Sequence, residues 1–290
     1  MQKKNKVLLS AVPIAACVAA IGVGAPAAHA AGTSGATTYT ANLAAVTPNA
    51  PAGSVSGKVT VTVTGDQATV TEKVSGLAAK LPTDKKTLAS LGIPAAFAGA
   101  PFPHVQHIHI NGQGSCPTAA DDTNKDGVVS VKEGIPNYGN IGTTLSVKGT
   151  TDPSAAVDVT VAPGGANFTY QRTFTLNQPT LTAIKANKAE IVVHGLNPAN
   201  APKASLTSPN SLGVTLPGAT KKLALIGTAP TLCGQLTASQ MNTMPQGSVN
   251  TDYASTTDST NSVALAGGAA AIALGGAGVL LMRRRKHTNV

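Results

Sequence analysis

The strongest constraint on the fold is a run of alternating β-branched and polar residues that begins near Thr37. Its clearest stretch, residues 59–64, reads Val-Thr-Val-Thr-Val-Thr. Because successive side chains of a strand point to opposite faces, this alternation predicts a strand with one apolar face. Gly65, Asp66 and Gln67 separate it from a second such run at residues 68–74. The pair is therefore predicted to form a β-hairpin.

Similar short runs recur along the chain and are separated by Gly, Pro and Asn. They cover residues 105–110, 143–147, 157–161, 168–176, 190–193 and 222–226. This punctuation predicts an all-β protein, an antiparallel sandwich or barrel, with one short helix at residues 181–188. Only 3% of the residues are aromatic and none is Trp, so Val, Ile, Leu and Ala must build the core. The scarcity of stacking side chains argues against single-stranded nucleic-acid binding.

Both ends of the chain differ from this pattern. Lysines precede an apolar run at residues 7–23, and Ala28-His29-Ala30 resembles a signal-peptidase site, so residues 1–30 are predicted to be a signal peptide. A lipoprotein cleavage box ending at Cys17 is the alternative. Residues 263–282 lack charges and are long enough to cross a bilayer as a helix.

The basic residues that follow predict a cytoplasmic tail at residues 283–290, with the N-terminal body outside the cell membrane. Residues 31–236 are then the folded domain. Residues 237–262, rich in Ser, Thr and Asn, are predicted to be a flexible stalk. The sequence thus predicts a secreted, single-pass surface protein.

The net charge of +9 comes mainly from the two ends, because the balance between residues 31 and 262 is only +2. No nucleic-acid partner is therefore expected. Removal of the leader also removes Cys17, which leaves Cys116 and Cys233 as an even pair. In an oxidising compartment such a pair predicts one disulfide bond.

Residues 122–133 satisfy every position of the twelve-residue calcium-loop pattern. The predicted oxygen donors are Asp122, Asn124, Asp126, the carbonyl of Val128, Ser130 and Glu133. Gly134 and Pro136 directly follow the loop, so no exit helix is expected and the loop would be a static calcium clamp. The alternative is an acidic solvated loop that holds no ion.

Four histidines lie in the predicted outer domain. His107 and His109 are two residues apart on a predicted strand and share one face, while Ile108 and Ile110 point into the core. His104 has the opposite parity. Paired imidazoles at this spacing suit copper or zinc, although surface histidines without a metal have the same spacing.

A resemblance to a known family combines these features. His107-Ile108-His109, then Cys116, then Val192-Val193-His194, then Cys233-Gly234 resembles the order of elements in copper/zinc superoxide dismutases. Residues 102–116, 170–172 and 189–195 resemble more closely the secreted bacterial proteins of the CHRD type, which have a related β-sandwich. The resemblance implies a Greek-key fold, copper ligands at His107, His109 and His194, and a Cys116–Cys233 disulfide.

The chain also departs from the dismutase pattern. It lacks the further histidines of a two-metal site, and Pro230 stands where a dismutase has an anion-guiding Arg. A copper-only site would need His104 as its fourth ligand. No complete catalytic set is present, so we expect a calcium-binding surface module without enzymatic activity that binds a surface partner or its own copy. The alternative is a copper-only, dismutase-like oxidoreductase or a copper-holding protein that uses the same histidines.

Overall fold

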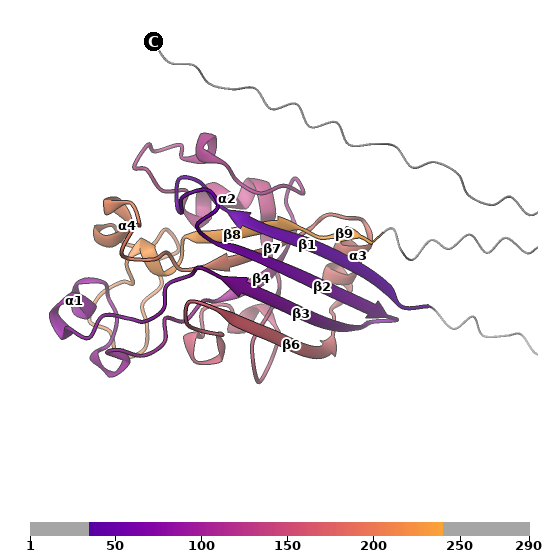
Figure 1. The fold of residues 1–290 in the computed structure, drawn as a ribbon, viewed down its shortest axis with the longest axis horizontal. Helices are drawn as coiled ribbons and strands as arrows, with labels where there is room; N and C mark the ends of the chain where they lie inside the picture. The colour runs from indigo at the N-terminus through magenta and orange to yellow at the C-terminus, as the bar shows by residue number, and fades with distance from the viewer. Residues whose placement is uncertain (1–34, 240–290) are drawn as a thin grey trace, which may run out of the picture. The chain divides into compact units, whose positions relative to one another are not determined.

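The computed structural model describes residues 35–239, which form one antiparallel sheet of nine strands. The strand order is β5-β4-β7-β8-β1-β2-β3-β6, and β9 pairs with β1. Figure 1 shows β1, β2, β3 and β6 side by side on the near side of the domain, with β4 and β7 behind them. The sheet curls into a half-barrel, so the predicted all-β class is confirmed.

The strands are short and connected mostly by loops. They are β1 Thr37–Ala45, β2 Ser56–Thr64, β3 Gln67–Ser75, β4 Gln106–Asn111, β5 Gly139–Thr144, β6 Phe168–Thr175, β7 Ala189–His194, β8 Pro230–Gln235 and β9 Thr237–Ala238. The helices are α1 Lys85–Ser90, α2 Val131–Tyr138, α3 Gln178–Lys185 and α4 Lys203–Thr207. Five 3-10 turns lie at Ala95–Phe97, Ala119–Asp121, Pro153–Ala155, Val159–Val161 and Leu225–Gly227.

The hairpin predicted from the Val-Thr alternation is formed by β2 and β3. Val61 is the partner of Val70, and Thr62 is the partner of Thr69. The valines of both strands are buried in the main core, while the threonines face outward and pair through hydroxyl groups on neighbouring strands. The period-two pattern therefore predicted the inner face of this hairpin, and the turn residues between the two runs predicted their pairing.

Two predicted strands are absent and one predicted helix is displaced. Residues 157–161 form a 3-10 turn capped by the Asp158 side chain, and residues 222–226 form no ladder beyond an isolated bridge. Helix α3 begins at Gln178, three residues before the predicted start, because Asn177 caps it and Pro179 occupies its first turn. Short apolar runs in connecting segments look like strands in sequence, but here Val159 and residues 223–226 pack into a second hydrophobic cluster.

The expectation that no helix follows the calcium-like loop was wrong. Helix α2 begins directly after Ser130, and both Gly134 and Pro136 lie inside it. The Ser130 hydroxyl accepts from the backbone N–H of Glu133, and the Glu133 carboxylate accepts from the backbone N–H of Ser130. This reciprocal cap compensates for two poor helix formers over an eight-residue helix.

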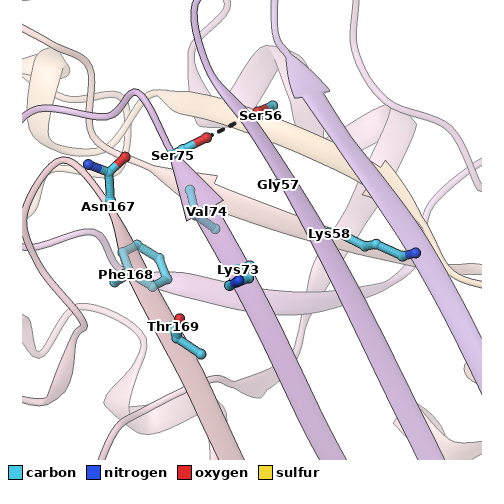
Figure 2. A pocket seen from close by; sticks show the side chains of 9 residues that line it. All are labelled: Ser56, Gly57, Lys58, Lys73, Val74, Ser75, Asn167, Phe168 and Thr169. Carbon is cyan, nitrogen blue, oxygen red and sulfur yellow. Dashed lines mark hydrogen bonds between the residues drawn. The ribbon is translucent and has the colours of Figure 1, made fainter.

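The outer face of the β2, β3 and β6 part of the sheet carries a shallow groove (Figure 2). Lys58 and Lys73 are direct partners on neighbouring strands there, and both are exposed. The lining of the groove also includes Val74 and Phe168 at the edge of the main core.

Among residues 35–239 no helix is long and apolar enough to cross a membrane. The predicted signal peptide, the transmembrane segment at 263–282 and the tail at 283–290 lie outside the described residues. The predicted stalk lies there too, except for its first three residues. Of these, Thr237 and Ala238 form β9 and Ser239 donates to the carbonyl of Thr38.

Candidate metal centre

Strand β4 is buried on both of its faces, so its histidines are buried as well as its isoleucines. Ile108 and Ile110 belong to the main core, so His107 and His109 project from the other face, as the parity argument predicted. In β7, Ile191 and Val193 point to the same core, which leaves His194 on the histidine face. The neighbouring strands β4 and β7 therefore bring the three rings to one spot.

The three histidines form a compact group. Each offers one ring nitrogen, and these nitrogens all lie within 4.8 Å of one another. The ring centroids of His107 and His194 are 5.2 Å apart, and those of His107 and His109 are 5.5 Å apart. Only 1–3% of the surface of each residue is exposed. The convergence predicted for these three residues is confirmed.

A backbone carbonyl fixes the other ring nitrogen of each histidine. His107 Nε2 lies 3.0 Å from the Ala156 oxygen, His109 Nδ1 lies 3.0 Å from the Gly139 oxygen, and His194 Nδ1 lies 2.7 Å from the Thr228 oxygen. Because a carbonyl only accepts, each of these nitrogens carries the proton. The remaining nitrogens, which are His107 Nδ1, His109 Nε2 and His194 Nε2, are buried and have no hydrogen-bond partner.

The electrostatics of the site keep the rings neutral. Burial, followed by repulsion from the His194 ring, lowers the pKa of His109 to about 3. Burial lowers the pKa of His194 to about 4, although its bond to the Thr228 carbonyl raises it. Burial and the two neighbouring rings hold the pKa of His107 well below its ordinary value. Three neutral imidazoles with converging lone pairs form a ligand set for a transition-metal ion.

The structure does not bring His104 into this group. Its Nδ1 lies 3.0 Å from the His194 carbonyl oxygen, and its Nε2 lies 3.1 Å from the Ala78 carbonyl oxygen. The ring also stacks on Phe102, with centroids 4.9 Å apart. Both nitrogens lie against backbone carbonyls, to one of which the neutral ring can donate, so His104 packs against the main chain at the end of β7 and is not part of the three-histidine group.

Gly139 explains how the loop after β4 reaches His109. Its φ is +84°, and a Cβ at this position would overlap the carbonyl oxygen of Ile110. Only glycine allows the chain to approach β4 so closely. The preceding residue, Tyr138, packs its ring edge-on against His109 with centroids 4.5 Å apart, and its hydroxyl donates to the Val131 carbonyl. The end of α2 therefore fixes the orientation of the His109 ring.

Glu190 lies next to the histidine group and was not among the residues predicted from the sequence. It is the cross-strand partner of His109, it is buried, and neither carboxyl oxygen has a hydrogen-bond partner. Burial, opposed by the charge of Lys188, raises the pKa of Glu190 to about 8. The signal was present in the sequence, since residues 190 and 194 share one parity in the predicted strand.

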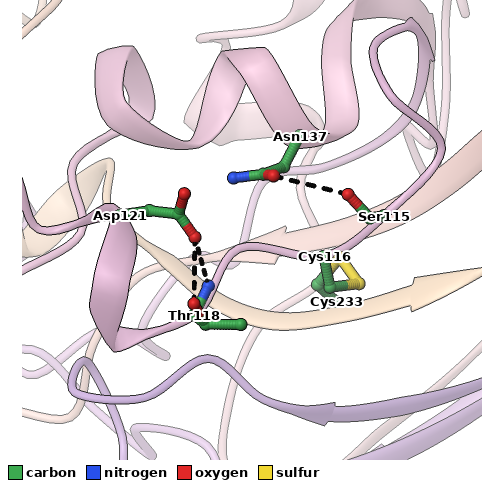
Figure 3. The surroundings of a disulfide bond; sticks show 6 residues. All are labelled: Ser115, Cys116, Thr118, Asp121, Asn137 and Cys233. Atoms are coloured by element: carbon green, nitrogen blue, oxygen red, sulfur yellow. Dashed lines mark hydrogen bonds between the residues drawn. A yellow bond between two sulfur atoms is a disulfide. The ribbon is translucent and has the colours of Figure 1, made fainter.

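The predicted disulfide between Cys116 and Cys233 is present, with Cα atoms 5.7 Å apart. Cys233 lies in β8 and is the partner of Val192, so the bond lies on the histidine face of the sheet. Figure 3 shows how the bond ties the segment after β4 to the sheet beneath α2, with Ser115 and Asn137 hydrogen-bonded beside it. The loop that carries Gly139 is thereby attached covalently next to the metal-ligand candidates.

The calcium-like loop folds around hydrogen bonds of its own. Glu133 Oε1 accepts from the backbone N–H groups of Thr123 and Asn124, and its Oε2 caps α2. Asp122 accepts from the backbone N–H groups of Asp126 and Gly127. Within residues 35–239 the three-histidine group meets the geometry of a metal site, whereas the carboxylates of this loop do not converge in that way. Calcium binding at Asp122, Asn124, Asp126, Val128, Ser130 and Glu133 is therefore not supported.

No protein-family model matches the chain, and no curated protein matches it. The likeness to dismutases and CHRD-type proteins therefore rests on the motifs named above.

Proposed function

We propose that this chain is a membrane-anchored, extracytoplasmic protein whose β-domain holds one copper ion at His107, His109 and His194 without turning over a substrate. The observation that carries the proposal is the set of three buried ring nitrogens that have no partner and face one another. A buried polar atom without a hydrogen bond is costly, and a metal ion would satisfy all three at once. The histidine metal site, which the sequence predicted only as the alternative, is therefore better supported than the predicted calcium loop.

Copper fits this donor set better than zinc does. Structural zinc almost always takes four ligands, whereas His104, the predicted fourth ligand, has both nitrogens on backbone carbonyls. Copper stands at the top of the affinity order for divalent metals at nitrogen sites. The order of motifs, which resembles the copper strands of a dismutase, supports the same choice.

A holding function is favoured over turnover because the ring-bearing residues are almost completely buried. Three histidines leave one coordination position of the ion open, but the burial of all three rings restricts the access of a substrate to it. Extracytoplasmic location is supported by the disulfide, because such bonds persist in oxidising compartments. The N-terminal leader pattern and the apolar segment at 263–282 support a membrane anchor with the domain outside.

Metal analysis of the purified full-length chain tests this proposal. After incubation with copper, zinc and calcium together, followed by dialysis, we expect one copper ion per chain and no stoichiometric calcium. His107→Ala and His194→Ala should lose the copper, whereas Asp126→Asn in the calcium-like loop should retain it. Copper retained equally by both histidine variants, or no copper in the parent chain, would overturn the proposal. Superoxide turnover by the loaded chain would favour the oxidoreductase instead.

A further inference from the structure

A second group of unpaired polar atoms lies inside the barrel, on the other face of the sheet from the histidines. Glu72 is the sixth residue of β3, and its neighbours on the same face, Val70 and Val74, belong to the main core. Glu72 itself has no exposed surface. A carboxyl group therefore stands in the apolar interior at a position where the alternation of the strand would place a valine.

Two other polar side chains reach the same interior. Tyr170 of β6 is the direct cross-strand partner of Glu72, and Gln106 of β4 points inward with Ile108. Both carboxyl oxygens of Glu72, the hydroxyl oxygen of Tyr170 and the amide oxygen of Gln106 are buried without a hydrogen-bond partner. Gln106 Nε2 lies 3.4 Å from the Leu145 carbonyl oxygen, which fixes the direction of its amide.

The Glu72 and Gln106 side chains meet across the barrel. Four strands separate β3 from β4 in the sheet, so their contact spans the interior and does not follow the ladder. The Gln106 side chain is near enough to affect the titration of Glu72. Tyr170, Glu72 and Gln106 thus form a line that joins edge strand β6 to the strand whose outer face carries His107 and His109.

Within residues 35–239 no cation is hydrogen-bonded to the carboxyl group of Glu72. The guanidinium group of Arg172, which neighbours Tyr170 on β6, is bound to the Ser146 carbonyl and hydroxyl oxygens and to the Gly149 carbonyl oxygen. Lys58 and Lys73 line the groove on the outer face of the sheet (Figure 2). Two other buried titratable side chains of the domain are Tyr39 of β1 and His104. The two ring nitrogens of His104 lie against backbone carbonyl oxygens.

We propose that Glu72 is a neutral carboxylic acid at physiological pH, whose O–H donates to Gln106 Oε1 while its carbonyl oxygen accepts from the Tyr170 hydroxyl. We call this line of three side chains the interior clasp. It gives each of the four unpaired oxygens one partner, with the two hydroxyl protons that Glu72 and Tyr170 already carry. The interior clasp opens when Glu72 loses its proton, because the O–H that bonds the Gln106 amide oxygen is then gone.

The direction of the pH effect follows from the buried position. Burial, opposed by the Gln106 side chain, raises the pKa of Glu72 from 4.5 to about 8. Glu72 ionises in the unfolded chain near pH 4.5 and in the folded chain only near pH 8. Its contribution to stability is therefore complete below pH 4.5 and is lost as the pH rises through 8. The clasp is a proton-dependent device that operates independently of any metal.

A double-mutant cycle on the metal-free full-length chain tests the clasp. Glu72→Leu and Gln106→Leu should each lower Tm at pH 5, by about 2–4 °C for each lost kcal/mol of stability. The double variant should be no worse than the worse single variant, which is the sign of a direct interaction. At pH 10 this coupling should vanish, and Glu72→Leu should raise Tm above that of the parent chain.

Glu72→Gln provides the matched control because an amide can still donate to Gln106 but cannot ionise. The difference between the Tm of Glu72→Gln and that of the parent chain should increase from pH 4.5 to pH 8 and then remain constant. Glu190→Gln removes the other buried carboxyl group, from the opposite face, and should show no coupling to Gln106→Leu. If the leucine variants do not fold, the infrared band of protonated carboxyl groups at pH 7 decides the question. A band that Glu72→Gln leaves unchanged, or coupling that persists at pH 10, would overturn the proposal.

Discussion

The Nδ1 atom of His104 lies 3.0 Å from the backbone carbonyl oxygen of His194. His104, which is not a member of the histidine cluster, therefore contacts the main chain of His194, which is. The other nitrogen of His104 bonds to Ala78. A neutral ring donates to one of these carbonyls at a time, so we expect His104→Leu to leave one buried carbonyl without its donor, to remove the ring stacked on Phe102 and to lower the free energy of unfolding by about 1–3 kcal/mol. His107→Leu also removes one such bond, but it removes an unpaired nitrogen with it, so its effect should be smaller. Urea denaturation of both variants measures the difference, and equal effects would contradict this role of His104.

The histidine cluster predicts loss of stability in acid for the metal-free protein. The folded-state pKa values of about 3 for His109 and about 4 for His194 lie below the ordinary value of 6.5. The unfolded chain therefore takes up protons first as the pH falls, and the contribution present above pH 6.5 is lost progressively down to about pH 3. Because Glu72 and Glu190 act in the opposite direction over the same pH range, the decline should be measured as the difference in Tm between the parent chain and a His109→Gln, His194→Gln double variant from pH 7.5 to 4. Saturating copper should move the onset of this difference to lower pH. A parent Tm that does not fall relative to that of the double variant would refute the assignment.

Gly139 offers a test of how the loop positions His109. Gly139→Ala should destabilise the domain and weaken copper retention, because its Cβ would push the chain away from Ile110 and carry the carbonyl bonded to His109 with it. Gly149 is the matched control, since it also has a positive φ, +73°, but open space around it. Gly149→Ala should cost about 1–2 kcal/mol from backbone strain alone and leave copper binding unchanged. Copper titrations of the two variants distinguish the two effects.

Much of this site follows from the sequence because strand parity is local. The two-residue spacing of His107 and His109, with isoleucines between and after them, was enough to place both rings on one face. The convergence of His194 depended on a neighbouring strand that is 85 residues away in the chain, and only the resemblance to a known motif order suggested it. Parity cannot indicate which strands pair, because pairing is a property of the whole sheet.

The parts that the sequence did not predict depend on tertiary contacts. The runs at residues 157–161 and 222–226 have strand-like composition, but one is a 3-10 turn and the other forms no strand ladder. Their neighbours, Ala156 and Thr228, supply carbonyls to His107 and His194. The acidic loop matches a calcium pattern in residue types, and in the structure its carboxylates accept hydrogen bonds from its own backbone, so calcium binding there stays a prediction.

Glu133 supports a prediction about that loop. Because its two oxygens accept from the backbone of the loop and cap α2, Glu133→Ala should lower the free energy of unfolding by about 1–2 kcal/mol. The loss should be the same with millimolar calcium as with a chelator, and the parent Tm should not respond to calcium. Asp66→Asn, at an exposed turn, controls for the removal of a charge. A calcium-dependent rise in the Tm of the parent that Glu133→Ala abolishes would restore the calcium clamp.

The disulfide should couple stability to metal retention. The Cys116–Cys233 bond closes a loop of 117 residues, and chain entropy predicts a stabilisation of about 4–5 kcal/mol for a closure of that size. The segment that it attaches leads through α2 to Gly139, whose carbonyl holds the His109 ring. The Cys116→Ser, Cys233→Ser double variant should therefore unfold at lower urea and also release copper faster to a chelator under conditions where it remains folded. Faster release while the circular dichroism is unchanged is the decisive result, because it separates loosening of the site from unfolding. If the folded variant retained copper as long as the parent chain, the bond would stabilise the domain without positioning His109.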